Sequence, residues 1–212
     1  MEDIMSKRAI LAVTAAVALT TVVVAGCSGS GGGSHSGSKA TSGSSSAQRP
    51  GPAPTESNPP GDIPDNQVYV AYRPPAGGFT VKVPEGWARS SAHGTTTFSD
   101  KLNKVEILRS SAGTAPTVQS VKADMVPALR RQASHFSLGS VTTVHRKAGQ
   151  AIRITYQTDS APDPVTGKAV RDSVERYVFF HNGREAVLTL TGPTGADNVD
   201  PWRVVSDSLR WQ

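Results

Sequence analysis

The residue with the most distinctive chemistry in this chain is Cys27, its only cysteine. A thiolate is a strong nucleophile and a metal ligand, so a single cysteine calls for an assigned role. Cys27 follows the small residues Val24, Ala25 and Gly26, which end an apolar stretch over residues 9–25. A basic start, an apolar core and small residues before a cleavage point are typical of the leader of an exported precursor.

A cysteine in this position resembles the lipobox of bacterial lipoproteins, in which the thiol receives a diacylglyceryl group before the leader is cut. The resemblance implies that residues 1–26 are a signal peptide and that Cys27 anchors the chain to the outer face of the cell membrane. Two acyl chains hold stably where one does not, because each buried methylene contributes about 0.8 kcal/mol. Val24 departs mildly from the leucine that this pattern prefers. The alternative is an uncleaved membrane anchor with an incidental cysteine, and either Met1 or Met5 fits as the start.

The composition changes abruptly after the cysteine. Residues 28–46 are nearly all glycine and serine, and residues 50–64 are rich in proline. Such segments bury too little apolar surface to offset chain entropy, so we expect a disordered tether over residues 27–66. The remaining residues, 67–212, have the length of one domain. With Cys27 lipidated this domain has no thiol, which excludes disulfides, cysteine–zinc sites and a catalytic cysteine.

No other group of residues has a spacing that predicts catalysis or metal binding. Ser36 and Lys39 match the Ser-x-x-Lys pattern of penicillin-recognising enzymes, but they lie in the tether without the partner motifs. The Gly192–Gly195 segment lacks the Lys-Ser/Thr of a phosphate-binding loop. The domain's histidines show no metal-ligand spacing; they are His93, His135, His145 and His181. We therefore predict no catalytic residue, no metal and no cofactor.

Four carboxylates gather around residues 159–175. Asp159 and Asp163 flank a long loop, and Asp172 and Glu175 lie on the strand that follows. Cation binding is one interpretation, but the spacing fits no known calcium loop. Ordinary surface charge is the favoured interpretation.

Alternating and amphipathic patterns predict the elements that position these residues. We expect strands at 79–83, 95–98, 104–108, 140–145, 150–158, 171–180 and 184–191. A helix beginning at about Thr117 carries Pro127, which predicts a kink or an early end. Asn182-Gly183 between two strands predicts a tight hairpin in which both residues have positive φ. The final helix is predicted to have Asp200 as its N-cap. This order indicates an α+β fold, an antiparallel sheet of about six to seven strands flanked by two helices.

The run from Phe79 to Trp87 resembles the opening strand of actinobacterial extracytoplasmic domains with a PsbP/Mog1-like fold. The strand at 150–156, the hairpin at 171–191 and the closing residues from Trp202 to Trp211 also fit that pattern. Such domains occur in lipoproteins and at the external ends of bacterial Ser/Thr kinases. The resemblance implies a PsbP/Mog1-like fold and an accessory, sensory or envelope-associated binding role, and it supplies no catalytic set.

Positive charge is in excess in the domain, which holds 18 lysines and arginines against 12 aspartates and glutamates. Such an excess favours anionic partners, namely an envelope polymer, a phospholipid head group or an acidic envelope protein. Nucleic acid is not expected, because no aromatic stacking motif accompanies the charges. A solvated surface of mixed sign is the alternative. The residues that could form one patch are Arg109, Arg130, Arg131, Arg146 and Lys147.

Large aromatic side chains are the candidates for a ligand-binding site. Most belong in a core, but a cleft between the last helix and the sheet would be lined by Trp202 or Trp211, with Trp87 as a further candidate. The leading hypothesis is a lipid-anchored, non-enzymatic binding or sensing domain in the cell envelope. The alternatives are an envelope hydrolase or transferase whose site assembles only in three dimensions, and a structural assembly partner.

Overall fold

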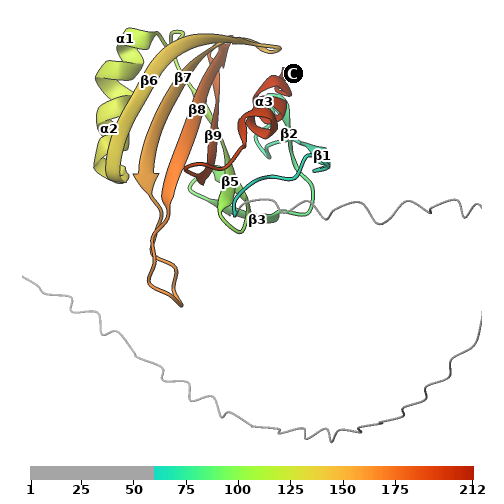
Figure 1. Ribbon diagram of the computed structural model, residues 1–212. Helices are drawn as coiled ribbons and strands as arrows, with labels where there is room; N and C mark the ends of the chain where they lie inside the picture. The colour runs from blue at the N-terminus through green and yellow to red at the C-terminus, as the bar shows by residue number, and fades with distance from the viewer. Residues whose placement is uncertain (1–59) are drawn as a thin grey trace, which may run out of the picture. The chain divides into compact units, whose positions relative to one another are not determined.

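The computed structural model describes residues 60–212, which fold into two antiparallel sheets and short helices (Figure 1). The strands are β1 (Tyr69–Tyr72), β2 (Phe79–Pro84), β3 (Ala88–Ala92), β4 (Thr95–Asp100), β5 (Asn103–Ser111), β6 (Ser134–Arg146), β7 (Gly149–Asp159), β8 (Arg171–His181), β9 (Arg184–Pro193) and β10 (Arg210–Trp211). The helices are α1 (Val118–Ser120), a π-helical turn (Val121–Met125), α2 (Val126–Gln132) and α3 (Val199–Asp207).

The main sheet has seven strands in the order β3-β4-β5-β9-β8-β7-β6, and β1, β2 and β10 form a separate small sheet. All the strand pairs are antiparallel. One face of the main sheet carries α1 and α2, and the other carries α3 with the small sheet (Figure 1). A long loop between β7 and β8 projects beyond one end of the sheet. The α+β fold class is therefore confirmed.

Each face of the main sheet has its own apolar core, because successive side chains of a strand point to opposite faces. On the α3 face, Tyr177 and Phe179 of β8 pack with Leu188 of β9. Val205 of α3 and Leu209, just after the helix, belong to the same cluster. On the α2 face, a second cluster joins the helices to β6, β7 and β8; its members are Val121, Val126, Leu129, Val141, Ile152, Ile154, Tyr156 and Val174. These two cores place α2 and α3 on opposite sides of the same strands.

Several predicted elements are confirmed and others need correction. The hairpin between β8 and β9 has φ of 49° at Asn182 and 76° at Gly183, as the Asn-Gly pair predicts. Pro127 lies in the first turn of α2, directly after the π-helical turn that interrupts the predicted helix. The strand predicted at 79–83 belongs to the small sheet and not to the main one. β1, β3 and β10 were not expected, and β6 begins at Ser134, well before residue 140.

The helix α3 has Asn198 as its N-cap, so the prediction of Asp200 was wrong. The Asn198 side chain does not cap the helix, because it ties the segment before β1 to the domain instead. Its Oδ1 accepts from the Ile63 amide at 2.9 Å, and its Nδ2 donates to the Gly61 carbonyl at 2.9 Å and to Asn103 Oδ1 at 3.0 Å. Ile63 is only 5% exposed. The packed region thus begins before residue 67, inside the range that composition assigns to the tether.

The predicted leader, lipobox and Cys27 lie outside the described residues. Among residues 60–212 no helix is long and apolar enough to cross a membrane.

Candidate functional site

A cleft of about 410 Å³ lies between α3 and strands β6, β7 and β8. We call it the Trp202 cleft. Its lining comprises Ser137, Leu138, Gly139, Thr155, Tyr156, Gln157, Ser173, Val174, Glu175 and Trp202. Hydroxyl, amide and carboxylate groups therefore face one large aromatic ring, a mixture suited to recognising a polar ligand with some apolar surface.

Trp202 forms the helix side of the cleft, and a glycine allows it to approach the sheet. A Cβ built on Gly192 of β9 would lie 3.4 Å from Trp202 Cζ2, and only 2.6 Å from Asn103 Oδ1 and 2.7 Å from Asn198 Nδ2. Any side chain at position 192 would therefore displace the asparagine pair and press on the indole. Gly192 positions both the start of α3 and the aromatic wall of the cleft.

The β6 side of the cleft is shaped by a break in strand pairing. The register between β6 and β7 shifts between Leu138 and Ser140, at Gly139. A Cβ at Gly139 would lie 2.6 Å from Thr155 Oγ1, which accepts from the Ser140 amide at 2.8 Å. A bulge bends its strand and is enriched beside functional sites. Here the bulge lies among the lining residues Leu138 and Gly139.

Glu175 is held by two donors. Its Oε1 accepts from Arg153 Nη1 at 3.2 Å, and its Oε2 accepts from the Tyr177 hydroxyl. The same hydroxyl accepts from Arg146 Nη2 at 3.0 Å, and Arg146 Nε donates to Ser206 Oγ on α3 at 3.0 Å. The carboxylate is thus fixed to both the sheet and the helix, while its remaining lone pairs stay available to a ligand.

Burial raises the pKa of the Tyr177 phenol, and its hydrogen bond to Glu175 raises it further. Tyr177 therefore keeps its proton and acts as a donor to Glu175 at physiological pH. Glu175 is the only aspartate or glutamate that lines the Trp202 cleft, and no histidine, lysine or arginine lines it. The arrangement provides hydrogen-bond acceptors and an aromatic surface. Its one other ionisable residue, Tyr156, has its ring in the cluster on the α2 face.

The three predicted tryptophans are not brought together in one cavity. Trp202 lines the cleft, as expected for a groove between the last helix and the sheet. Trp211 on β10 packs edge-on against Phe79, with ring centroids 5.9 Å apart, and stacks on His181 at 5.5 Å. Trp87 packs, partly buried, against the core on the α3 face. Only Trp202 is therefore placed to contact a ligand in this cleft.

The five predicted basic residues lie in three separate places: Arg130 with Arg131, Arg146 with Lys147, and Arg109. Arg130 and Arg131 end α2, whereas Arg146 ends β6, a strand of 13 residues that starts just after α2. At about 3.3 Å per residue the two sites are roughly 40 Å apart. Arg109 lies on β5 beside Gly78 and Arg184. Binding to an anionic partner stays a prediction. These positions mean that such a partner would contact a cluster smaller than the five-residue patch.

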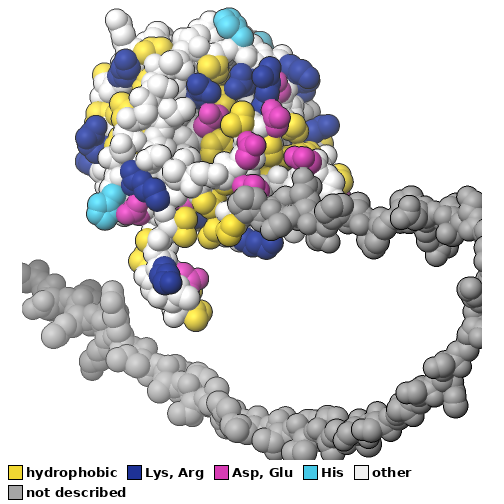
Figure 2. All heavy atoms as spheres, viewed as in Figure 1, with side chains coloured by type: hydrophobic (Ala, Val, Ile, Leu, Met, Phe, Trp, Pro, Cys, Tyr) yellow, Lys and Arg dark blue, Asp and Glu magenta, His cyan; other side chains and the backbone are white. Residues whose placement is uncertain are grey.

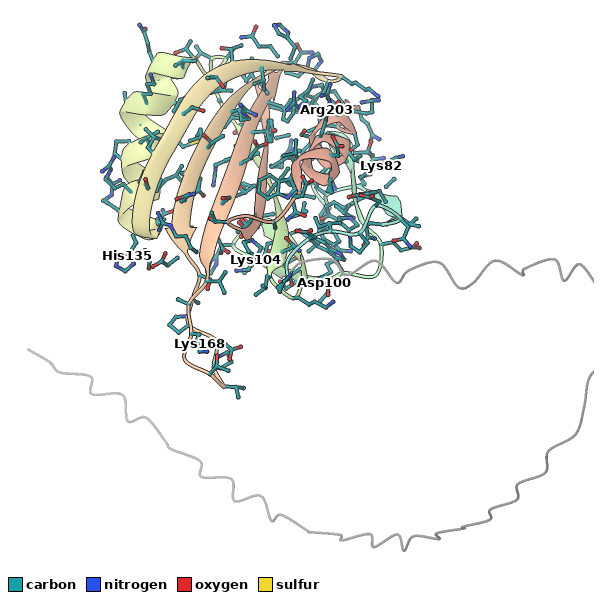
Figure 3. The ribbon with its side chains drawn as sticks, viewed as in Figure 1. Lys82, Asp100, Lys104, His135, Lys168 and Arg203 are labelled. Atoms are coloured by element: carbon teal, nitrogen blue, oxygen red, sulfur yellow. The ribbon has the colours of Figure 1, made fainter. Side chains whose placement is uncertain are left out.

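One such cluster has both signs of charge. Lys147 lines a cavity of about 560 Å³ between β2 and α3, together with Lys82, Asp200, Arg203, Asp207 and Arg210. Figure 2 shows lysine, arginine and acidic side chains interspersed over this region. The mixture resembles the solvated surface of mixed sign that the sequence left as the alternative. Figure 3 shows Lys82 and Arg203 on the small-sheet and α3 side of the domain.

Sequence reasoning treated Glu175 as surface charge and did not single out Tyr177 or Arg153. The available signal was their position: Glu175 and Tyr177 are two apart on a strand, so they share a face. Arg153 is the register partner of Tyr177 on β7. Ionisable residues on the inward face of two paired strands are rarely left unpaired, and that pattern could have predicted this network.

Comparisons with known proteins found no matching family model and no matching curated protein. Among solved structures, the cyanobacterial PsbP of Synechocystis is similar at 12% identity and a TM-score of 0.48, covering 72% of this chain and 98% of that one. The Ran-binding protein Mog1p of Saccharomyces cerevisiae has 8% identity and a TM-score of 0.43, over 66% of this chain and 87% of that one. LpqN of Mycobacterium tuberculosis, described as involved in cell envelope biogenesis, has 13% identity and a TM-score of 0.39. The match covers 68% of this chain and 91% of that one.

The chain covers 48% of the length of a further similar structure, from Bacteroides thetaiotaomicron. The proteins named in these comparisons include the PsbP and Mog1 of the sequence-based resemblance. With TM-scores below 0.5, they carry no argument about ligand or partner.

Proposed function

We propose that this chain is a lipid-anchored envelope protein whose extracytoplasmic domain binds without catalysing a reaction. In this proposal Cys27 carries the anchor and the Trp202 cleft is the binding site. Its ligand is a hydroxyl-rich chain, a saccharide segment of an envelope polymer. The anchor is supported by the leader and lipobox pattern alone, and the binding site by the geometry described above.

The observation that carries the binding site is the fixed Glu175 carboxylate beside Trp202. A carboxylate already oriented by two donors accepts a ligand hydroxyl without losing rotamer freedom on binding. The amide of Gln157 has no side-chain hydrogen bond within the described residues, so it can both donate and accept. The indole of Trp202 supplies a flat apolar surface for the C–H groups of a sugar ring.

The same residues favour binding over hydrolysis. Most glycoside hydrolases use a pair of carboxylates on either side of the scissile bond. The Trp202 cleft has one, and that one is engaged by Arg153 and Tyr177. A single carboxylate engaged in this way does not supply the acid and base pair that hydrolysis requires.

The test is tryptophan fluorescence of the purified full chain during titration with chitotriose and, separately, maltotriose. We expect a saturable change with at least one of them. W202F should abolish that change, and E175Q should weaken binding about tenfold because a charge-assisted hydrogen bond is lost. W211F is the matched control and should retain the response. The proposal fails if neither sugar changes the fluorescence at 10 mM, on the order of ten times a weak millimolar Kd, or if W202F responds like the unmodified chain.

A further inference from the structure

A second cavity lies on the opposite face of the main sheet and contains a buried carboxylate. Asp172 is only 5% exposed, and it points to the α2 face because Val174, two residues further along β8, belongs to the α2 cluster. This is the face opposite the Trp202 cleft. The sequence interpretation of Asp172 as surface charge is therefore wrong, since the loop before β8 and the end of α2 cover it.

The Asp172 carboxylate has no hydrogen bond or ion pair within residues 60–212. The neighbouring cation is already engaged, because Arg171 Nη1 donates to Asp159 Oδ1 at 2.9 Å and to the His135 carbonyl at 2.7 Å. His135 Nδ1 also contacts Asp159, at 2.7 Å. A buried charge without a partner is unfavourable, and proteins rarely retain one that serves no purpose.

Asp172 lines a cavity of about 490 Å³, which we call the Asp172 cavity. Its floor is formed by β5, β9 and β8, where Lys104 is in register with Thr191 and Glu106 with Thr189. The end of α2 and the segment Thr158–Ala161 form its walls. A volume of this size is within the usual range for small-molecule sites. Figure 3 shows Lys104 and His135 at the same end of the main sheet, from which the loop bearing Lys168 projects.

Two cationic side chains line this cavity together with Asp172. Arg176 also lines it, and Arg176 Nε is buried without a hydrogen-bond partner among the described residues. Arg176 is four residues beyond Asp172 on β8, about 13 Å along the strand. Lys104, on β5, is exposed and acts on Asp172 electrostatically. The cavity therefore holds an unpaired acceptor, Asp172. Lys104 lies in the row of Thr191 and Val174 close to it, and Arg176 lies further along, in one row with Thr189 and Glu106.

We propose that the Asp172 cavity binds a small zwitterion of dipeptide size. Its ammonium group donates to the Asp172 carboxylate, and its own carboxylate accepts from Arg176 and Lys104. The Asp172 carboxylate and the cationic side chains of the lining then each meet a group of opposite charge. This site is independent of the Trp202 cleft and does not rest on the saccharide proposal.

A metal ion fits this cavity less well than an ammonium group. Among residues 60–212 no group of three or more histidine, cysteine, aspartate or glutamate side chains is placed to hold a metal. Of the other two carboxylates in the lining, Asp159 is engaged by Arg171 and His135, and Glu106 lies in one row with Thr189 and Arg176. A simple anion is disfavoured as well, because Asp172 would repel it.

The test is a titration of the ¹⁵N-labelled full chain with alanyl-alanine, followed by amide chemical shifts. We expect saturable shifts at Asp172, Thr158 and Thr191. N-acetyl-alanyl-alanine, which lacks the ammonium group, should cause no saturable shift. Alanyl-alaninamide, which lacks the carboxylate, should bind at least threefold more weakly than the zwitterion.

Matched variants separate the proposed contacts from general effects. D172N is nearly isosteric and should weaken alanyl-alanine binding at least tenfold, and K104Q should weaken it about threefold. D124N alters an exposed carboxylate on the π-helical turn, away from the cavity lining, and should leave binding unchanged. Equal binding of the acetylated dipeptide, or full binding by a folded D172N, overturns the proposal. Failure here with an intact chitotriose response would refute only this site.

Discussion

Tyr177 and Glu175 share one face of β8 and are joined by a hydrogen bond from the phenol to the carboxylate. Tyr177 is 1% exposed, and its hydroxyl also accepts from Arg146, whose guanidinium lies 5.1 Å from the tyrosine ring. The single hydroxyl thereby links the carboxylate of the Trp202 cleft to Arg146, which also bonds α3. Removing that hydroxyl tests whether the link holds the cleft together.

We expect Y177F to destabilise the domain by about 1–3 kcal/mol, because two charged partners lose a buried hydrogen bond. Urea unfolding followed by circular dichroism measures this difference. Y69F is the control, since Tyr69 packs against the same core but its hydroxyl has no side-chain hydrogen bond within the described residues. A Y177F domain as stable as Y69F would show that the network contributes nothing to stability.

Asp172 should make stability depend on pH. Burial raises its pKa, as does Asp159, while Lys104 lowers it. A raised pKa means that the folded protein holds this proton more tightly than the unfolded chain. Stability attributable to Asp172 is therefore full below the ordinary carboxyl value of about 3.9 and falls as the pH rises through the raised value.

The D172N variant should accordingly be more stable than the unmodified chain at pH 7, because the unmodified chain must ionise a buried carboxyl group there. The difference should close below about pH 4, where the carboxyl is protonated in both states. Urea unfolding across this pH range provides the measurement, with D124N as the reference for loss of an exposed charge. A constant difference at every pH would contradict the buried carboxylate as its cause.

The sequence predicts those parts of the fold that depend on neighbouring residues. The strands β7, β8 and β9 and the Asn182-Gly183 turn follow from alternation and from the need for positive φ. β3 was missed because all its residues are exposed and show no alternation, and β10 because it has two residues. Neither strand has a local signal, so only pairing with distant strands reveals it.

The candidate sites were less predictable, because long-range contacts create them. Trp202 was identified as a groove residue from its place on an amphipathic helix. Asn198 was missed as the helix start because its partners Asn103 and Gly61 are 95 and 137 positions away. The burial of Asp172 likewise depends on the end of α2 and on a loop, which no periodicity along β8 indicates.

G192A should test the close packing that brings α3 onto the sheet. Its methyl group would lie 2.6 Å from Asn103 Oδ1 and 2.7 Å from Asn198 Nδ2, so the bond between these asparagines has to break or shift. We expect a loss of about 1–3 kcal/mol of stability and a changed Trp202 emission. G113A is the control, because nothing lies within 4 Å of a Cβ there and the residue is outside the positive-φ region. Equal stability of the two variants would mean that α3 tolerates displacement.

C27A tests the membrane anchor, which the sequence pattern alone supports. Cells expressing the full chain are labelled with radioactive palmitate, and the protein is then recovered from membrane and soluble fractions. We expect C27A to lose the label, because no other thiol exists in the chain to accept a lipid. S28A, which alters the adjacent residue and leaves the thiol in place, is the matched control and should keep it. Label retained by C27A would contradict lipidation at this cysteine. Unlabelled C27A recovered in the membrane fraction would favour the uncleaved membrane anchor.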